Sequence, residues 1–355
     1  MNLRSLLLLF HLSLLTQAAS SNSSGLGVCD IFAVGGTPCV AAHSLTRALY
    51  TSYNGPLYLV LNSASNATKD IGVISAGGIA DTAAQDIFCG SALCIVQRIY
   101  DQSPSGNHLG IEHGPSWFKP PRNSQDAGVN LTAASRVSLS GLPVYSAVFD
   151  THCETTGAES CDGLFAGYSN RTARDTPVDE EPQTVYAIYN GKHYNTGCCF
   201  EYGNAEKNST MLNGSMEAVY YGCNDTHPPL PACELGPYVY SDLEHMHEMM
   251  TLPGFEPVRL QPVDFIFAIV KGEKGRLSVA TADAQQDTVL RILYDGLYPN
   301  NYTSKKQGGI VLGVGGDNSP YGSGTFFEGV IVRGFSSSEV DAAVLANIVA
   351  AKYAR

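Results

Sequence analysis

Cysteine is the residue that most constrains how this chain can fold. The chain has ten cysteines, and eight of them fall into four local couples: Cys29/Cys39, Cys89/Cys94, Cys153/Cys161 and Cys223/Cys233. If each couple closes its own short loop, the adjacent Cys198 and Cys199 have only each other. Such a bond is unusual, because neighbouring Cα atoms lie ~3.8 Å apart, below the ~4.4–6.8 Å common for bridged cysteines. Connectivity does not follow from sequence alone, so cross-links from this pair to distant cysteines stay an open alternative.

The first residues have the pattern of a secretory signal peptide. A single positive charge at Arg4 precedes an apolar run over residues 6–15, and small residues follow at positions 18–20, as in signal peptides generally. We therefore expect residues 1–20 to be removed and residues 21–355 to form a secreted, extracellular protein. In that compartment cysteines form disulfides rather than metal or redox sites. No later apolar run approaches the ~18 residues that a membrane span needs.

The composition is that of an acidic, loop-rich β-protein. The net charge of −12 and the pI near 5.1 argue against nucleic acid or an anionic membrane as partner. With 36 glycines, 18 prolines and 19 tyrosines, many turns are expected, and each tyrosine ring offers a sugar an apolar face and a hydroxyl. Asn-x-Ser/Thr sequons, which predict glycosylation on surface loops, occur at Asn22, Asn66, Asn130, Asn170, Asn208, Asn213, Asn224 and Asn301.

Short runs with the alternation of strands extend along most of the chain. Many such runs separated by turn signals indicate a sandwich or a barrel. No proline-rich or serine-rich linker divides them, so we expect a single domain over 21–355, with residues 151–179 as an insertion. The predicted strands cover residues 56–62, 93–100, 144–149, 184–189, 216–221, 238–243, 263–270, 276–281, 309–314 and 326–332.

Helix signals are few. Thr37-Pro38 reads as an N-cap followed by proline at the first helical position, which predicts a short helix towards Tyr50. Residues 81–88 fit one or two helical turns. Near the C-terminus, Ser336-x-x-Glu339 has the form of a capping box, and apolar residues then recur at helical spacing at Val340, Val344 and Ile348.

Two acidic motifs stand out as candidate chemistry. In Asp242-Leu243-Glu244 the two acids are two residues apart, so a strand would project both from one face, which is useful in a cleft but also occurs on an exposed strand. Asp317, in Gly315-Gly316-Asp317-Asn318, ends a predicted strand; the alternative is an Asx-turn that closes a loop. Pattern alone does not choose between these acids and Glu201, Glu206, Glu217 and Glu328.

A metal site is the alternative interpretation of the residues around Asp242-Leu243-Glu244. His245 and His247 would share a strand face, but Asp242 and Glu244 lie on the other face and no third strong ligand is fixed nearby. A catalytic zinc set needs three protein ligands. We therefore expect no metal and no cofactor.

The run from His193 to Glu206 resembles the vicinal-disulfide segment of the α-L-arabinofuranosidases of glycoside hydrolase family 54. The resemblance extends from Cys29 to Tyr353. It implies an all-β, concanavalin-like (jelly-roll type) sandwich with a short C-terminal helix. It also implies that Cys198 and Cys199 bond to each other and form part of the sugar-binding floor. The couples Cys29/Cys39 and Cys89/Cys94 match family disulfides, whereas Cys153/Cys161 and Cys223/Cys233 look like additions.

The same resemblance implies a role for each acidic motif. Glu244 matches the catalytic nucleophile and Asp317 the general acid/base, while Asp242 and Gly316 match positions that contact the sugar. The implied activity is retaining hydrolysis of terminal α-L-arabinofuranosyl groups from plant cell-wall arabinan or arabinoxylan, by a monomer. The alternatives are a lectin-like sandwich that binds sugar without turnover, and a structural wall protein.

The chain departs from the family at three points. His245 and Met246 stand where the family has Asn-Gly, both placed to contact the sugar. Family members bring a tryptophan to the site from the loop before the strand of Asp242. The only tryptophan of this chain, Trp117, lies far upstream of that strand. Full-length members also continue into an arabinose-binding β-trefoil domain, whereas this sequence ends at Arg355, so we expect the catalytic half alone.

Overall fold

The structure is a computed structural model. It describes residues 25–112, 128–153, 161–163, 166–208, 215–223, 236–243, 260, 262–298 and 302–355. The predicted signal peptide, Trp117, Glu244, His245, Met246 and His247 lie outside these residues. No helix within the described ranges is long and apolar enough to cross a membrane.

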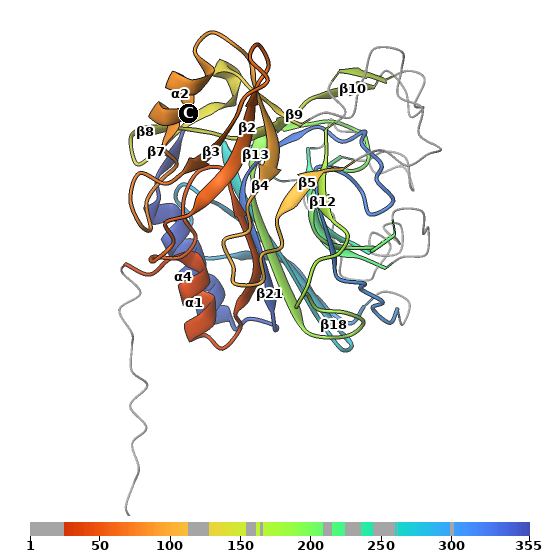
Figure 1. Cartoon of the computed structure of the whole chain (residues 1–355). Coiled ribbons are helices and arrows are strands. Elements are labelled where there is room, and N and C mark those ends of the chain that lie inside the picture. Colours follow the sequence, from red (N-terminus) through yellow and green to blue (C-terminus); the bar gives the residue numbers. More distant parts are fainter. Residues whose placement is uncertain are drawn as a thin grey trace, which may run out of the picture.

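Two large antiparallel sheets pack face to face and form a β-sandwich (Figure 1), as the sequence predicts. The first, of seven strands, runs in the order β1-β21-β13-β17-β18-β19, with β9 also paired to β21. Its strands are β1 (Cys39–Ser44), β9 (Ala147–Phe149), β13 (Gln183–Tyr194), β17 (Phe265–Glu273), β18 (Arg276–Asp283), β19 (Arg291–Gly296) and β21 (Gly324–Arg333).

The second sheet has ten strands and carries most of the candidate site. Its order is β16-β15-β14-β20-β12-β5-β4-β2-β3, with β6 also paired to β4. Its strands are β2 (Pro56–Asn62), β3 (Thr68–Gly72), β4 (Cys94–Ile99), β5 (Leu109–Ile111), β6 (Asn130–Leu131), β12 (Tyr168–Asn170), β14 (Glu201–Ala205), β15 (Glu217–Gly222), β16 (Tyr238–Asp242) and β20 (Gly309–Leu312).

Smaller elements complete the described fold. Helices α1 and α4 lie side by side against the seven-stranded sheet, at lower left in Figure 1. The remaining elements are the helices α1 (Val28–Val34), α2 (Thr82–Cys89), η1 (Ala133–Ser135) and α4 (Ser338–Ala350), and the strands β7 (Arg136–Leu139), β8 (Leu142–Tyr145), β10 (Thr151–Cys153), β11 (Cys161–Gly163) and β22 (Tyr353–Ala354).

Aromatic side chains fill the space between the two sheets. Tyr189 of β13 stacks on Tyr221 of β15, with ring centroids 5.8 Å apart, and its ring lies 5.0 Å from that of Phe200. Its hydroxyl donates to the carbonyl oxygen of Val219 at 2.9 Å, so the polar end of a fully buried ring is satisfied. Tyr221 therefore faces the core, and its neighbour Tyr220 faces the opposite side of the ten-stranded sheet.

The predicted helix from Thr37 towards Tyr50 is wrong. The helix comes earlier, as α1, and residues 39–44 form β1, which pairs with β21 from Cys39↔Val332 to Ser44↔Glu328. Every residue of β1 is buried. Burial against a long neighbouring strand outweighs the local signal of one proline.

The predicted insertion over residues 151–179 is also partly wrong. Its strand β12 lies inside the ten-stranded sheet, between β20 and β5. A strand of three residues is too short to show alternation in the sequence. The other two strands of the segment, β10 and β11, pair only with each other and place Cys153 and Cys161 as Cα partners.

The C-terminal helix is confirmed, but its cap is shifted by one residue. The side chain of Ser337 accepts from the Val340 amide at 3.4 Å, so Ser337 is the N-cap. The predicted cap, Ser336, is buried and hydrogen-bonds Thr184 and Asp341 instead. Helix α2 also confirms its prediction, and the side chain of Asp81 caps it by accepting from the amide of Ala84.

Three predicted disulfides are present. Cys29–Cys39 joins α1 to β1, Cys89–Cys94 joins the end of α2 to β4, and Cys198 bonds to Cys199. Cys223 is disulfide-bonded, with its predicted partner Cys233 outside the described residues. The pairings Cys223/Cys233 and Cys153/Cys161 stay predictions.

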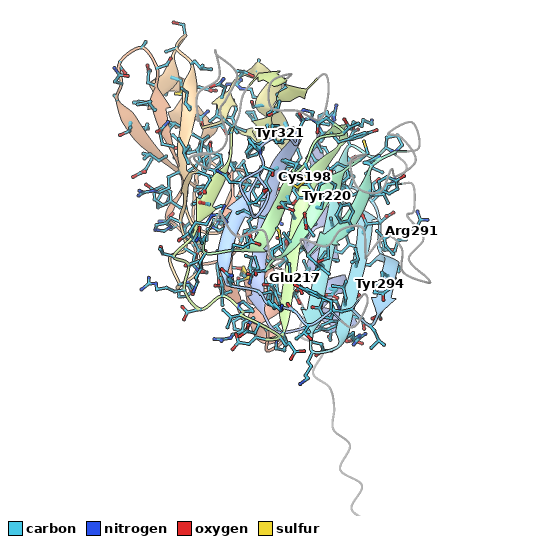
Figure 2. All side chains as sticks on the ribbon, turned by 90° about the vertical axis from the view of Figure 1, so that its right-hand side faces the viewer. Cys198, Glu217, Tyr220, Arg291, Tyr294 and Tyr321 are labelled. Atoms are coloured by element: carbon cyan, nitrogen blue, oxygen red, sulfur yellow. A yellow bond between two sulfur atoms is a disulfide. The ribbon has the colours of Figure 1, made fainter. Side chains whose placement is uncertain are left out.

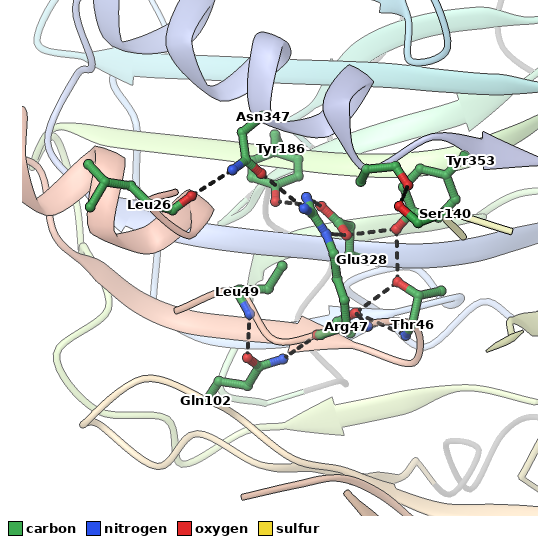
Figure 3. A network of polar contacts seen from close by, with 12 residues as sticks. Leu26, Thr46, Arg47, Leu49, Gln102, Ser140, Tyr186, Glu328, Asn347 and Tyr353 are labelled. Atoms are coloured by element: carbon green, nitrogen blue, oxygen red, sulfur yellow. Dashed lines mark hydrogen bonds and ion pairs between the residues drawn. The ribbon is translucent and has the colours of Figure 1, made fainter. Parts of the chain in front are cut away.

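A buried ion pair ties the seven-stranded sheet to both ends of the described chain (Figure 3). Arg47 donates twice to Glu328 of β21, at 2.6 and 2.7 Å. Glu328 also accepts from the hydroxyls of Tyr186 at 3.1 Å and Tyr353 at 2.7 Å, so both of its oxygens are used twice. Arg47 further donates to Asn347 of α4 at 2.9 Å. One carboxylate thus links β13, β21, β22 and, through Arg47, α4.

This network predicts an asymmetry between buried and exposed ion pairs. Glu328→Gln leaves the Arg47 guanidinium buried without its counter-charge, and we expect it to lower the free energy of unfolding by about 3–5 kcal/mol. The matched control is Asp295→Asn, which removes the carboxylate of the exposed Arg276–Asp295 pair and should cost less than about 1 kcal/mol. Urea denaturation measures both. Equal losses would show that the buried pair contributes no more than a surface pair.

Candidate active site

The adjacent cysteines lie in the connection between β13 and β14 (Figure 2). Their peptide bond is cis; Cys199 is buried, whereas Cys198 is partly exposed. The amide of Cys199 donates to the carbonyl oxygen of Ser319 at 3.2 Å, and the amide of Tyr321 donates to that of Cys198 at 3.0 Å. The pair is therefore held against the loop that follows β20.

Asp242 reaches the same place from β16. Only 3% of Asp242 is exposed, and its Oδ2 lies 3.8 Å from Sγ of Cys199. A disulfide sulfur carries no proton, so this is a packing contact. On the same strand face, Tyr240 stacks on Tyr220 with ring centroids 4.3 Å apart. Together, the disulfide, the carboxyl and two tyrosine rings line the side of the ten-stranded sheet that faces away from the core.

Asp317 lies on the loop after β20. Its Oδ1 accepts from the Ser319 amide at 2.9 Å and from the Ser319 hydroxyl at 2.5 Å. This is the Asx-turn that the sequence left as an alternative, and it holds a half-buried carboxyl in one orientation. A Cβ placed on Gly315 would lie 3.1 Å from that Oδ1 and 3.5 Å from Sγ of Cys199. The carboxyl of Asp317 and the disulfide thus meet above Gly315.

The loop folds back over the outer face of the sheet. Val314 packs there in a small separate apolar cluster, formed with Ala205, Met216, Ala218 and Val311. The turn is made at Gly313 and Asn318, both with positive φ (76° and 70°), and not at Gly316. Gly316 is required for a different reason: a Cβ there would lie 2.1 Å from Oε2 of Glu206 and 2.8 Å from Sδ of Met216.

Glu206 is an acid that the sequence noted but did not select. It is fully buried just after β14, and its Oε1 accepts from the Ser215 amide at 3.3 Å. Oε2 has no hydrogen-bond partner among the described residues. Burial raises the pKa of Glu206, and the charge of Asp242 raises it further. This carboxyl therefore holds its proton at pH values where an exposed glutamate has lost it.

Arg171 is a site residue that the sequence gave no reason to choose. Its Nη1 donates to two carbonyl oxygens, those of Glu206 and Gly316, both at 2.9 Å. Its Nη2 pairs with Glu112 at 3.3 Å. Arg171 follows a three-residue strand within a glycosylation sequon, so no local pattern marks it. It fastens the loop of Asp317 to the end of β14.

Two of the competing acids belong to the framework. Glu217 accepts from Tyr298 at 2.5 Å and from Gln183 at 3.1 Å, and lies 3.5 Å from the ammonium of Lys306. Glu328 belongs to the Arg47 network. Glu201 is the Cα partner of Tyr220, so it shares the face of the candidate site. Glu244, two residues beyond Asp242, lies outside the described residues.

One group of side chains has the spacing of a metal site. The ligand atoms of Cys198, Cys199 and Asp242 lie within 4.8 Å of one another. Metals bind cysteine as thiolate, and these two sulfurs are bonded to each other. The group therefore serves as a surface for packing rather than as a ligand set.

Comparison with known proteins gives a consistent result. A family model, "Alpha-L-arabinofuranosidase B, catalytic", matches residues 28–354. A probable α-L-arabinofuranosidase B of Aspergillus terreus is 42% identical, over 92% of this chain and 62% of that protein. The α-L-arabinofuranosidase B of Aspergillus oryzae is 39% identical, over 95% of this chain and 64% of that protein. The chain thus spans less than two thirds of the length of these relatives.

Solved structures agree with the sequence relatives. A GH54 α-L-arabinofuranosidase soaked with a cyclic sulfate inhibitor is 36% identical, with a TM-score of 0.80 over 92% of this chain and 66% of that chain. An arabinofuranosidase complexed with arabinofuranosyl-α-1,2-xylobiose has the same identity and TM-score, over 93% of this chain. By its family model and these relatives, the chain belongs to the catalytic-domain family of α-L-arabinofuranosidase B, glycoside hydrolase family 54.

Proposed function

We propose that this protein is a secreted, retaining α-L-arabinofuranosidase in which Glu244 is the nucleophile and Asp317 the general acid/base. The observation that carries the proposal is the meeting of three segments at one place. Asp317 is oriented by Ser319 beside the Cys198–Cys199 disulfide. The carboxyl of Asp242 touches the same disulfide and ends the strand that leads to Glu244.

The chemistry needs only two carboxyl groups. In the first step the Glu244 carboxylate attacks the anomeric carbon, the glycosidic C–O bond breaks, and the leaving oxygen takes the proton of Asp317. In the second step a water gives a proton to Asp317 and attacks the same carbon, which releases arabinose and restores Glu244. Because two displacements occur at one carbon, the product keeps the configuration of the substrate. No cofactor takes part in either step.

The floor of the site suits a furanose ring. We infer that the disulfide offers the ring a flat apolar surface and that Asp242 and the backbone at Gly316 bind its hydroxyl groups. We infer that the substrate is a terminal arabinofuranosyl group of arabinan or arabinoxylan in plant cell walls. A related structure that holds arabinofuranosyl-α-1,2-xylobiose supports this inference.

We further propose that the protein acts outside the cell as a monomer. The disulfides Cys29–Cys39 and Cys89–Cys94 are stable in an oxidising compartment. Two of the sequons, at Asn66 and Asn208, lie on exposed loops where a glycan has room. The sequons at Asn130 and Asn170 lie in strands, and those at Asn22, Asn213, Asn224 and Asn301 fall outside the described residues.

Substitution of the two acids tests the assignment. Glu244→Gln should abolish turnover of every arabinofuranoside, because no nucleophile remains. Asp317→Asn should lower kcat severely on natural glycosides but mildly on aryl arabinofuranosides, whose good leaving groups need little protonation. Added azide should speed Asp317→Asn by attacking the intermediate without base help, and the glycosyl azide should keep the substrate's configuration.

The azide product also reveals an error in the assignment. If Glu244→Gln forms a glycosyl azide, azide has taken the place of the nucleophile and made a single displacement. The azide then has inverted configuration, which fits the proposal. The same inverted product from Asp317→Asn would show that the two roles are exchanged. Wild-type turnover by Glu244→Gln would overturn the nucleophile, and an inactive wild type would overturn the function itself.

The vicinal disulfide should matter for sugar binding more than for stability. A bond between neighbours closes almost no loop, so it removes little chain entropy from the unfolded state. We expect Cys198→Ser/Cys199→Ser to raise KM for an aryl arabinofuranoside with little change in the free energy of unfolding. Peptide mapping without reduction should find both cysteines in one peptide, bonded to each other alone. A second peptide attached to either of them would refute the pairing.

A further inference from the structure

Glu206 is a buried acid that the proposed chemistry does not use. It lies against the loop of Asp317, at Gly316. Its Oε2 would be 2.1 Å from a Cβ on Gly316, which means that the carboxyl presses against the Cα of the glycine. Any side chain at position 316 would have to displace this carboxyl and also move the end of Met216. Glu206 and Gly316 are therefore complementary in shape.

Arg171 holds the same two residues together through their backbones. One nitrogen, Nη1, bridges the carbonyl oxygens of Glu206 and Gly316. The residue before Asp317 is thus clamped from two directions, by the Arg171 guanidinium at its carbonyl and by the Glu206 carboxyl at its Cα. A clamp on Gly316 limits where the next side chain, that of Asp317, can go.

Burial is the main effect that favours the uncharged form of Glu206. The charged and titratable groups that face it among the described residues are Asp242 on β16, Arg171 beyond β12 and the hydroxyl of Tyr302 before β20. Arg171 is already paired with Glu112. Burial raises the pKa of Glu206 and Asp242 adds to the rise, whereas hydrogen bonds from backbone amides and the charge of Arg171 oppose it without reversing it. An uncharged carboxyl can press on the glycine Cα without a counter-ion, whereas a charged one would be costly there.

We propose that Glu206 is a positioning residue for the reaction, acting through Gly316 to hold Asp317 at the leaving oxygen. The inference rests on the proposed function, in which Asp317 donates the proton. It assigns to Glu206 no contact with the substrate. Its effect should therefore appear in the step that needs a proton.

A double-mutant cycle between Glu206 and Gly316 tests the clamp. We expect G316A to lower kcat on an alkyl arabinofuranoside on the order of 10²-fold, the loss that a misplacement of about 1 Å can cause. E206A removes the closer of the two groups that an alanine at 316 would strike, and leaves only the flexible end of Met216 to move. The kcat of the double variant E206A/G316A should therefore be at least about tenfold higher than that of G316A, since residues in contact do not act additively.

The leaving group separates positioning from general damage to the fold. In E206A we expect a larger loss of kcat on the alkyl arabinofuranoside than on 4-nitrophenyl arabinofuranoside, because only the first needs full protonation of its leaving oxygen. E206Q keeps the volume of the side chain and should lose less than E206A. Equal losses of kcat on both substrates would overturn the proposal. So would a double-mutant cycle in which Glu206 and Gly316 are coupled in the free energy of unfolding but not in kcat.

The protonation state of Glu206 has its own readout. Folded Glu206 binds its proton more tightly than the unfolded chain does, so wild-type stability should fall as the pH rises from the usual carboxyl range towards the raised pKa. E206Q has no proton to lose there. The difference in free energy of unfolding between wild type and E206Q should thus shift in favour of E206Q as pH rises. A constant difference would contradict the uncharged form.

A remote variant supplies the control. Tyr353→Phe removes a hydrogen bond to Glu328, so it should lower the melting temperature while leaving the ratio of kcat on the two substrates unchanged. A changed ratio in this variant would show that the ratio reports stability, and would overturn the inference drawn from it. If wild type hydrolyses neither substrate, the proposed function fails as a whole. If wild type is active and the cycle is additive in kcat, only the role of Glu206 fails.

Discussion

The ion pair between Arg47 and Glu328 fixes the part of the fold from which the site is built. Removing two charges from water is costly, and a buried pair needs further hydrogen bonds to offset that cost. Here Glu328 takes two hydrogen bonds from Arg47 and one each from Tyr186 and Tyr353. Because these partners come from β13, β22 and the segment after β1, the pair sets how they meet at β21. Strands β13 and β21 also flank the connections that form the site.

The site depends on which face of the second sheet each strand presents. Core aromatics such as Tyr221 fix one face of β15 against β13, and alternation then puts Tyr220 on the other. The same register, with Tyr220 opposite Tyr240, places Asp242 beside the disulfide. A shift of one residue in β16 would turn Asp242 into the core. Packing between the sheets thus decides where the acids of the site lie.

Local sequence patterns predicted the elements that depend on neighbouring residues in the chain. Most strands and the helix α2 follow from local patterns, which also predict a sandwich or a barrel, and the position of Asp317 follows from the strand before it; the choice of a sandwich came from the family resemblance. The helix expected from Thr37 fails because the neighbour of β1 is nearly 300 residues away in the sequence, at β21. Arg171 and Glu206 could not be selected for the same reason. Their roles come from contacts with Gly316, more than 100 residues away.

Two buried glutamates at neighbouring strands show how environment alone separates framework from site. Glu217 begins β15 and has an ammonium, a phenol and an amide around it, from Lys306, Tyr298 and Gln183. Such partners satisfy the hydrogen-bonding capacity of a buried carboxyl group. Glu206 follows β14 and, among the described residues, accepts only from backbone amides, while the charge of Asp242 opposes its ionisation and that of Arg171 favours it. A buried carboxyl so poorly matched is costly as a stabilising group. Its position against Gly316 is therefore better explained by the loop of Asp317 than by the stability of the fold.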